Sequence, residues 1–282
     1  MNRAVCILDQ NGVVLHSENS ETATPLYSIT KTMIAVLVVD LVSDLRRAAG
    51  DWLDKNWLPR GGEISIFQLL THTSGLTDYG GLAAYQTAVA AGDDPWNDRQ
   101  YADQTLCQPL LFEPGEGWAY SNPGFWVLKR VCELESGKEF ASLVQEQIAS
   151  RFNAPSLHVA SGLFSDRLPT YQAGWVWHGL VCGNARDTAR FMASNLVSRL
   201  NKTLVAVPNA GPLYPNAAYG LGVMGDLSGT NYGHNGSGPG FSTSCFHFPG
   251  TRRTVSCFLP YDGPEDAAYM QMQTLAKKFG LT

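Results

Sequence analysis

The sequence lacks the features that mark several large classes of protein. Its 282 residues contain no apolar run of the ~18 residues that a membrane-spanning helix needs. The formal net charge is only −5, from 25 acidic and 20 basic residues, and no basic run appears. A nucleic-acid surface needs a basic patch, so we expect no nucleic-acid partner. Because no apolar run is long enough, we also expect no membrane span. The sequence carries no signal for the oligomeric state.

Signatures of metal sites and of one large hydrolase class are also missing. The six cysteines form no C-x-x-C pair, and no two histidines have H-x-x-x-H spacing, so no metal or other cofactor is expected. The G-x-S-x-G elbow of α/β-hydrolases does not occur. Free, mostly buried thiols are expected, although Cys245 and Cys257 could face each other across a hairpin as one disulfide.

The N-terminal residues lack the pattern of a signal peptide. The stretch "MNRAVCILDQ" has a short apolar stub that ends at Asp9, with no longer apolar region and no small-residue cleavage site. The sequence therefore predicts a cytoplasmic protein. A mature chain that had lost its leader would look the same and would be periplasmic or secreted.

Strand-like segments lie at both ends of the chain, and helix-like segments lie between them. "AVCILDQNGVVLHSEN" predicts a hairpin that turns at Asn11-Gly12, and three strands are expected after Ala217. The first predicted helix begins near Ser28 and ends at about Ala49, and helical patterns recur in later segments. The helical segments are "ISIFQLLTHTSG", "NPGFWVLKRVCELESG", "NARDTARFMASNLVSRL" and "PEDAAYMQMQTLAKKFG"; the late strands are "AYGLGVMG", "STSCFHF" and "TVSCFLPY".

This segregation of strands from helices predicts an α+β fold and not an alternating α/β fold. The two ends of the chain would form one antiparallel β-sheet flanked by helices. The middle would form an inserted all-helical domain. The predicted boundaries are 1–48 with 181–282 for the sheet domain, and 49–180 for the insertion.

The first candidate for chemistry is Ser28-Ile29-Thr30-Lys31, at the start of the most apolar predicted helix. Residues three apart on a helix share a face, so Lys31 can reach the Ser28 hydroxyl. A lysine partly removed from water can help take the proton of a serine nucleophile. Taken alone, the motif is better explained by an N-cap serine followed by a surface lysine.

The second candidate is Tyr120-Ser121-Asn122, in a Gly/Pro-rich loop just before a helix. A tyrosine there can shuttle protons beside a cation, and an asparagine can bind a substrate amide. An aromatic anchor for the loop is the alternative. Tyr214-Pro215-Asn216 has the same pattern, but it does not lead into a helix, so we treat it as a decoy.

The third candidate is His234-Asn235-Gly236, within "NYGHNGSGPGFSTSCFHF". Its glycines would let the backbone approach a ligand closely, and the Ser237 N–H could serve as an oxyanion donor. The alternative is a flexible turn with a solvated histidine.

The order S-x-x-K, Y-x-N, H-x-G resembles that of the serine β-lactamase and penicillin-binding protein superfamily. The similarity is to the class C β-lactamase branch, with its DD-peptidases, D-aminopeptidases and esterases. The resemblance implies a β-lactamase/transpeptidase-like fold and covers nearly the whole chain. Its landmarks are "LLTHTSGL" (69–76), "YSNPGFWVL" (120–128), "GLVCGNARDTARFM" (179–192), "YGLGV" (219–223) and "GHNGSGPGFST" (233–243).

The resemblance also implies roles for these residues. Ser28 would be the acylated nucleophile, and Lys31 and Tyr120 would share the acid–base work in an order that the sequence does not decide. Asn122 would contact the lysine and the substrate amide. His234, with Asn235 and Gly236, would line the substrate strand. The N–H groups of Ser28 and Ser237 would form the oxyanion hole, whereas His72 would be structural.

One departure from the family bears on the substrate. His234 stands where β-lactamases usually have lysine, and a histidine with a pKa of ~6.5 is mostly neutral at pH 7. Arg252 or Arg253 is an alternative source of the missing charge, although a hairpin surface role is the simpler one. The expected function is therefore a serine hydrolase that forms an acyl-enzyme on an ester or amide. The alternatives are a β-lactamase or DD-carboxypeptidase proper, an acyl transferase, and a non-catalytic binder of peptides or cell-wall fragments.

Overall fold

The computed structural model describes residues 2–161, 163–164, 168–260 and 263–281. The chain divides into two compact units, and helix α1 (Thr30–Leu41) runs from one into the other. Unit 1 comprises Met1–Val36, Ala141–Ala160 and Leu180–Thr282, and unit 2 comprises Leu37–Phe140 and Ser161–Gly179. Residues 141–160, assigned to the insertion by the sequence, belong to unit 1. The predicted domain boundaries themselves stay a prediction.

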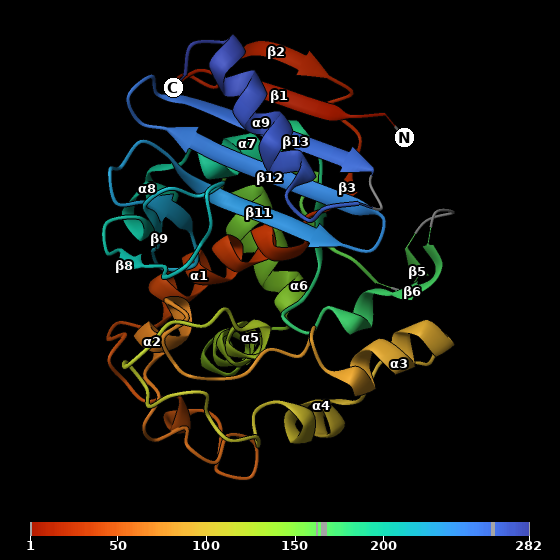
Figure 1. Ribbon diagram of the computed structural model, residues 1–282, viewed down its shortest axis with the longest axis vertical. Coiled ribbons are helices and arrows are strands. Elements are labelled where there is room, and N and C mark those ends of the chain that lie inside the picture. The colour runs from red at the N-terminus through yellow and green to blue at the C-terminus, as the bar shows by residue number, and fades with distance from the viewer. Residues whose placement is uncertain (1, 162, 165–167, 261–262, 282) are drawn as a thin grey trace. The chain divides into compact units, whose positions relative to one another are not determined.

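Unit 1 is built on an antiparallel sheet of eight described strands in the order β2-β1-β13-β12-β11-β10-β9-β8 (Figure 1). N-terminal strand β1 pairs with C-terminal strand β13, with Ala4 opposite Phe258. The expected α+β fold, with both chain ends in one antiparallel sheet, is confirmed. The strands are β1 Ala4–Leu8, β2 Val14–Glu18, β8 Val205–Ala206, β9 Ala217–Tyr219, β10 Met224–Asp226, β11 Tyr232–Gly238, β12 Phe241–Phe248 and β13 Arg253–Pro260.

Helices cover both faces of this sheet, so its central strands are buried on both sides. Helix α9 (Ala267–Lys278) lies in front of β12 and β13 in Figure 1, and α7 (Ala185–Met192) lies behind them. Side chains alternate along β12, so Phe246 and Phe248 join the α9 core with Met272. Cys245, which precedes Phe246, faces α7, where its Sγ lies 3.7 Å from the Thr188 carbonyl.

This alternation excludes the disulfide that the sequence left open. Cys245 pairs with Ser256, and Cys257 pairs with Ser244, so the two sulfurs belong to opposite faces of the sheet. All six cysteines are free thiols, and five of them are buried.

The helix that begins at the first motif is shorter than predicted. A 3-10 turn, η1 (Tyr27–Ile29), leads into α1, whose residues from Met33 to Val38 are no more than 1% exposed. Helix α1 ends at Leu41 and not near Ala49. Asp44 explains the early end, because its carboxylate accepts a hydrogen bond from the Arg46 N–H (3.0 Å) and competes with the helical ladder.

Two other elements are broken where one was predicted. The helix expected over "NARDTARFMASNLVSRL" is divided into α7 and α8 (Asn195–Leu200), because the Ser194 side chain accepts the Val197 N–H and caps a new helix. The strand expected over "AYGLGVMG" is divided into β9 and β10. The strand "TVSCFLPY" is described as far as Pro260, and its Tyr261 lies outside the described residues.

Unit 2 holds the loop and helix of the second motif. Helix α5 (Asn122–Ser136) starts at the predicted Asn122, and Gly137 caps its end in the left-handed conformation (φ 67°) that favours glycine. The other described helices, which are divided between the two units, are α2 Ile66–Leu70, α3 Ala83–Ala91, α4 Asp98–Gln104, α6 Phe140–Leu143, a π-helix at Val144–Ser150, and 3-10 turns at Ala49–Asp51 and Ala173–Trp175. Two smaller sheets contain β3 Thr24–Pro25, β7 Val181–Gly183 and β4 His158–Val159, and β5 Leu163–Phe164 with β6 Leu168–Gln172. Across the described residues, we find no helix with the length and apolar character of a membrane span.

Candidate active site

The first motif brings a buried lysine against a serine hydroxyl. Lys31 Nζ donates a hydrogen bond to Ser28 Oγ over 3.0 Å, and the Lys31 side chain is 0% exposed. The surface-lysine alternative is therefore wrong. Ser28 lies inside the 3-10 turn, whose N-cap position is Leu26, so the N-cap alternative does not describe it either.

The turn that carries Ser28 is held against the end of β11. Tyr27 adopts a left-handed conformation (φ 46°), unusual for an aromatic residue, and its hydroxyl donates to the Pro239 carbonyl at 2.7 Å. The preceding Leu26 carbonyl accepts the Thr243 hydroxyl at 3.3 Å. Strained backbone of this kind persists only where the surroundings determine it, which here means strands β11 and β12.

Two glycines of strand β11 allow the Ser28 turn to lie this close to the strand. A Cβ atom on Gly236 would lie 2.1 Å from the Leu26 carbonyl oxygen, and one on Gly238 would lie 2.1 Å from the Tyr27 ring. Strand β11 pairs with β10 only at Tyr232 and Gly233, so its later residues present an edge that β10 does not cover. The motif is thus part of a strand beside the Ser28 turn and not a flexible turn. The proposed oxyanion pair of Ser28 and Ser237 N–H groups stays a prediction.

His234 is buried and electrically neutral. Its Nδ1 lies 2.5 Å from the Asn235 carbonyl, which can only accept, so Nδ1 carries the proton and Nε2 accepts from the Tyr219 hydroxyl at 2.8 Å. Burial first, and then the charge of Lys31, lower the His234 pKa to about 3. His234 therefore cannot supply a cation near pH 7. Tyr219 was not singled out from the sequence, although the "YGLGV" landmark contains it.

The low pKa of His234 predicts a pH dependence of stability. Between the ordinary pKa of 6.5 and the folded-state value of about 3, the unfolded chain binds a proton that the folded protein excludes. Stability therefore rises with pH through this window: the His234 contribution is complete above it and is lost as the pH falls. Urea unfolding should show His234 lowering the free energy of unfolding by about 2 kcal/mol from pH 7 to pH 5. The His234→Gln variant should lack this fall in the free energy of unfolding. An equal pH dependence in the variant and in the wild-type protein would contradict the neutral, buried state of His234.

The structure excludes Arg252 and Arg253 as substitutes for the missing lysine. Arg253 pairs with Phe248, six residues along β12 from Ser242, which pairs with Ser237. That separation is about 20 Å along the strand. The Arg253 guanidinium instead donates to the Phe279 carbonyl at 3.1 Å.

In unit 2, His72 holds the loop that carries Tyr120. The His72 carbonyl accepts the Ala119 N–H at 3.0 Å, and its ring Nδ1 accepts the Ser121 N–H at 3.1 Å. The imidazole lies 4.4 Å from the Tyr120 ring, centre to centre. His72 thus binds the residues on either side of Tyr120. These hydrogen bonds agree with the structural role expected for His72.

Asp78 is a site residue that sequence reasoning missed. Its carboxylate accepts the Asn122 backbone N–H at 2.9 Å and the Asn122 side-chain NH₂ at 3.2 Å. This double contact orients the Asn122 amide at the first turn of α5. The signal was faint, because Asp78 follows "LLTHTSGL" by two residues and contacts a side chain 44 positions away.

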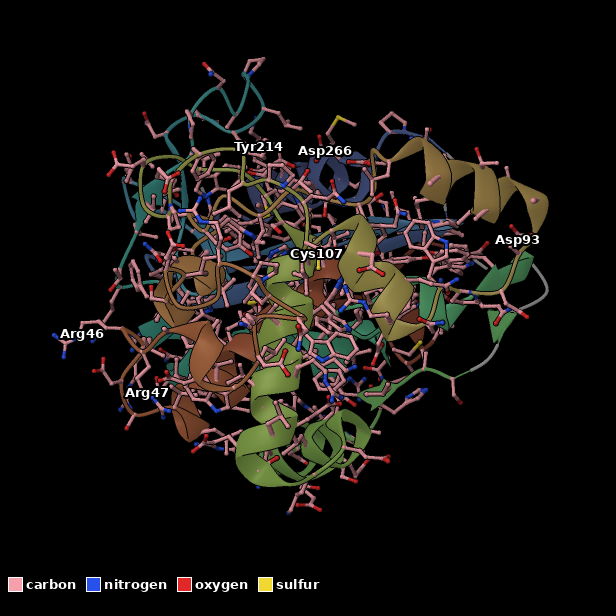
Figure 2. The ribbon with its side chains drawn as sticks, turned by 90° about the horizontal axis from the view of Figure 1, so that it is seen from below. Arg46, Arg47, Asp93, Cys107, Tyr214 and Asp266 are labelled. Carbon is pink, nitrogen blue, oxygen red and sulfur yellow. The ribbon has the colours of Figure 1, made fainter. Side chains whose placement is uncertain are left out.

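The supposed decoy, Tyr214, contacts the third motif. The Asn235 side-chain NH₂ donates to the Tyr214 hydroxyl at 2.8 Å, and that hydroxyl donates to Asp266. Figure 2 shows Tyr214 and Asp266 close together. Burial and this carboxylate raise the pKa of Tyr214, so the phenol keeps its proton. Tyr214 supports Asn235 and is no duplicate of Tyr120.

The candidate residues thus form two groups. Ser28 and Lys31 are in contact, and His234, Asn235, Gly236 and Ser237 belong to the strand beside their turn, all in unit 1. Tyr120 and Asn122 are neighbours in unit 2. The predicted contact of this second pair with Lys31 and substrate stays a prediction.

Comparisons with known proteins identify the family. The D-aminopeptidase of Cereibacter sphaeroides (strain KD131) is 25% identical over 280 residues, covering 88% of this chain and 52% of that protein. Penicillin-binding protein 4* of Bacillus subtilis (strain 168) is 30% identical over 162 residues, covering 54% and 34%. The chain thus spans about half, or less, of the length of these relatives.

The crystal structure of a D-stereospecific amidohydrolase from Streptomyces sp. has the same fold. It superimposes with a TM-score of 0.82 at 21% identity, covering 99% of this chain and 94% of that one. A family model described as Beta-lactamase matches residues 4–276. Because this match spans nearly the whole chain, the chain belongs to the β-lactamase family.

Proposed function

We propose that this protein is a serine hydrolase that forms an acyl-enzyme on Ser28 with an ester or amide substrate. The observation that carries the proposal is the 3.0 Å contact between Lys31 Nζ and Ser28 Oγ in a site that excludes Lys31 from water. A nucleophile and its base within hydrogen-bond reach are the structural signature of covalent catalysis.

The chemistry follows from these groups. Ser28 Oγ attacks the substrate carbonyl while its proton passes to the unprotonated amine of Lys31 or to the phenolate of Tyr120, and the leaving group departs with that proton from the same pair. The N–H groups of Ser28 and Ser237 would stabilise the oxyanion. Water then releases the acyl group and regenerates Ser28; another acceptor in place of water would make the protein an acyl transferase.

Among ester and amide substrates, the neutral state of His234 favours those without a carboxylate over β-lactams and DD-peptides. Those two substrate classes carry a carboxylate, for which a constant cation is useful, and His234 has a pKa of about 3. The relatives named D-aminopeptidase and D-stereospecific amidohydrolase support an amide substrate.

Covalent labelling tests the proposal. A fluorophosphonate probe should modify wild-type protein at Ser28, found by mass spectrometry, and should not modify Ser28→Ala. The exposed Ser17→Ala variant is the matched control and should label like wild type. Folded protein that labels neither with this probe nor with a fluorescent penicillin would overturn the proposal in favour of a non-catalytic binder. Penicillin labelling with slow release would instead support a penicillin-binding activity.

A further inference from the structure

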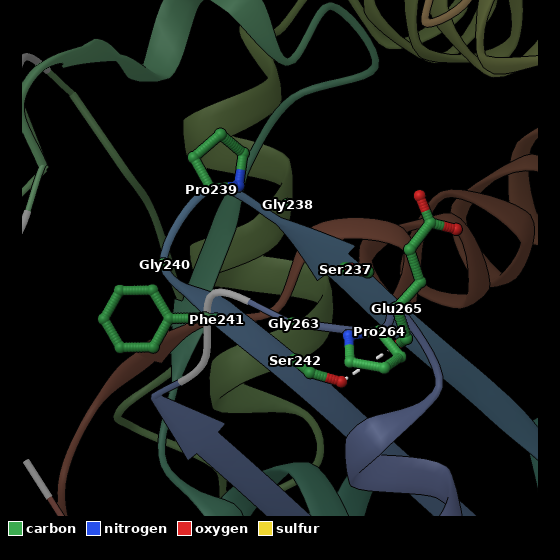
Figure 3. Close-up of a pocket in the computed structure, with 9 residues that line it drawn as sticks. All are labelled: Ser237, Gly238, Pro239, Gly240, Phe241, Ser242, Gly263, Pro264 and Glu265. Atoms are coloured by element: carbon green, nitrogen blue, oxygen red, sulfur yellow. Dashed lines mark hydrogen bonds between the residues drawn. The ribbon is translucent and has the colours of Figure 1, made fainter.

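A pocket of about 330 Å³ opens where the third motif ends. Its walls are the β11–β12 turn and residues 263–265, which precede α9, both in unit 1 (Figure 3). Ser237, whose N–H is the proposed oxyanion donor, forms one end of it. The lining residues are Ser237, Gly238, Pro239, Gly240, Phe241, Ser242, Gly263, Pro264 and Glu265.

Among the described residues of this lining, Glu265 alone is charged, and its backbone is held in place. The buried Ser242 hydroxyl donates to the Glu265 carbonyl at 2.8 Å and accepts the Ala268 N–H at 3.1 Å. The Glu265 side chain is exposed, and its carboxylate has no hydrogen-bond or ion-pair partner within the described part of the chain. Figure 3 shows this carboxylate turned away from Ser242.

Among the described residues near the pocket, we find no cation that compensates the negative charge of Glu265. The next residue, Asp266, adds a second carboxylate, which accepts the Tyr214 hydroxyl. His234 is neutral, and Arg253 belongs to the far end of β12 and β13. A substrate carboxylate in this pocket would meet like charge, whereas an ammonium group would meet opposite charge in a partly enclosed space.

We propose that this pocket is a subsite for a positively charged substituent, such as a primary ammonium group, of the ester or amide substrate. The inference rests on the proposed function, because Ser237 joins the pocket to the reacting carbonyl. Glu265 is then a residue that determines specificity and takes no part in the bond-making steps.

Matched p-nitroanilides test the subsite. The acyl groups are D-alanyl, 4-aminobutyryl and 6-aminohexanoyl, which place an ammonium at increasing distances, with propionyl as the neutral and succinyl as the anionic reference. The readout is the ratio of kcat/KM for each charged substrate to that for propionyl, at low and at high salt. Wild-type protein should prefer at least one cationic substrate, and added salt should weaken that preference.

The variants are Glu265→Gln and Glu265→Lys, with the exposed Glu139→Gln as a control for net charge. Glu265→Gln should lower the ratio of cationic to propionyl kcat/KM about fivefold, and Glu265→Lys should shift the preference toward succinyl, whereas Glu139→Gln should keep the wild-type ratios. Ratios that stay at the wild-type value in both Glu265 variants would overturn the subsite alone, provided that hydrolysis still needs Ser28. If wild-type protein hydrolyses no substrate and Ser28 is not labelled, the proposed function fails, and the subsite fails with it.

Discussion

Replacing Lys31 with methionine is expected to lower kcat/KM for an ester substrate by about 10³-fold. Lys31 Nζ contacts Ser28 Oγ at 3.0 Å, and its removal takes away the amine proposed to accept the Ser28 proton. Methionine keeps much of the buried volume without the amine. Because an ion in a 0% exposed position has lost its hydration, the substitution should not lower the free energy of unfolding by more than ~1 kcal/mol.

The measurement is steady-state hydrolysis together with urea unfolding, and the exposed Lys202→Met is the matched control. The control should keep wild-type kcat/KM and stability. Activity of Lys31→Met within a few-fold of wild type would show that Ser28 does not depend on this lysine. That result would leave Tyr120 as the base.

The second large effect is expected from Gly236→Ala. The new Cβ would lie 2.1 Å from the Leu26 carbonyl oxygen and 2.5 Å from Thr243 Oγ1, so the segment before Ser28 must move. Displacing a reacting group by about 1 Å can cost roughly 100-fold in rate, and we expect kcat/KM to fall by that factor. Overpacking should also lower the free energy of unfolding by about 1–3 kcal/mol.

Gly250→Ala is the matched control for this substitution. Gly250 lies between β12 and β13 in the same unit, and a Cβ there would meet no atom within 4 Å. Its activity should equal that of wild type, and its stability should change by less than ~0.5 kcal/mol. If Gly236→Ala behaves like Gly250→Ala, the close contact between β11 and the Ser28 turn does not position the nucleophile.

Local patterns predicted much of the fold. Asn11-Gly12 marked the first hairpin, Gly137 marked the end of α5, and the order of strands and helices gave the antiparallel sheet. The end of α1 was predicted wrongly, because apolar periodicity continues past Leu41, whereas the Asp44 side chain binds the backbone and stops the helix.

The site was predictable where its chemistry is local in sequence. Ser28 and Lys31 are three residues apart, and a helical turn joins them. Contacts between segments distant in the sequence could not be predicted from local patterns. Asp78 reaches Asn122, and Tyr214 reaches Asn235, only because the chain folds back on itself, and no spacing rule encodes such pairs. The neutrality of His234 also needed the fold, since burial sets it.

Detection of the acyl-enzyme tests the central claim, that Ser28 is the nucleophile, most directly. Protein mixed with p-nitrophenyl butyrate would be quenched in acid within the first turnovers, digested and analysed by mass spectrometry. We predict a butyryl mass increment on the peptide that contains Ser28, absent from Ser28→Ala and unchanged in Ser17→Ala. Hydrolysis that proceeds with no increment on that peptide, or with the increment on another residue, would contradict it.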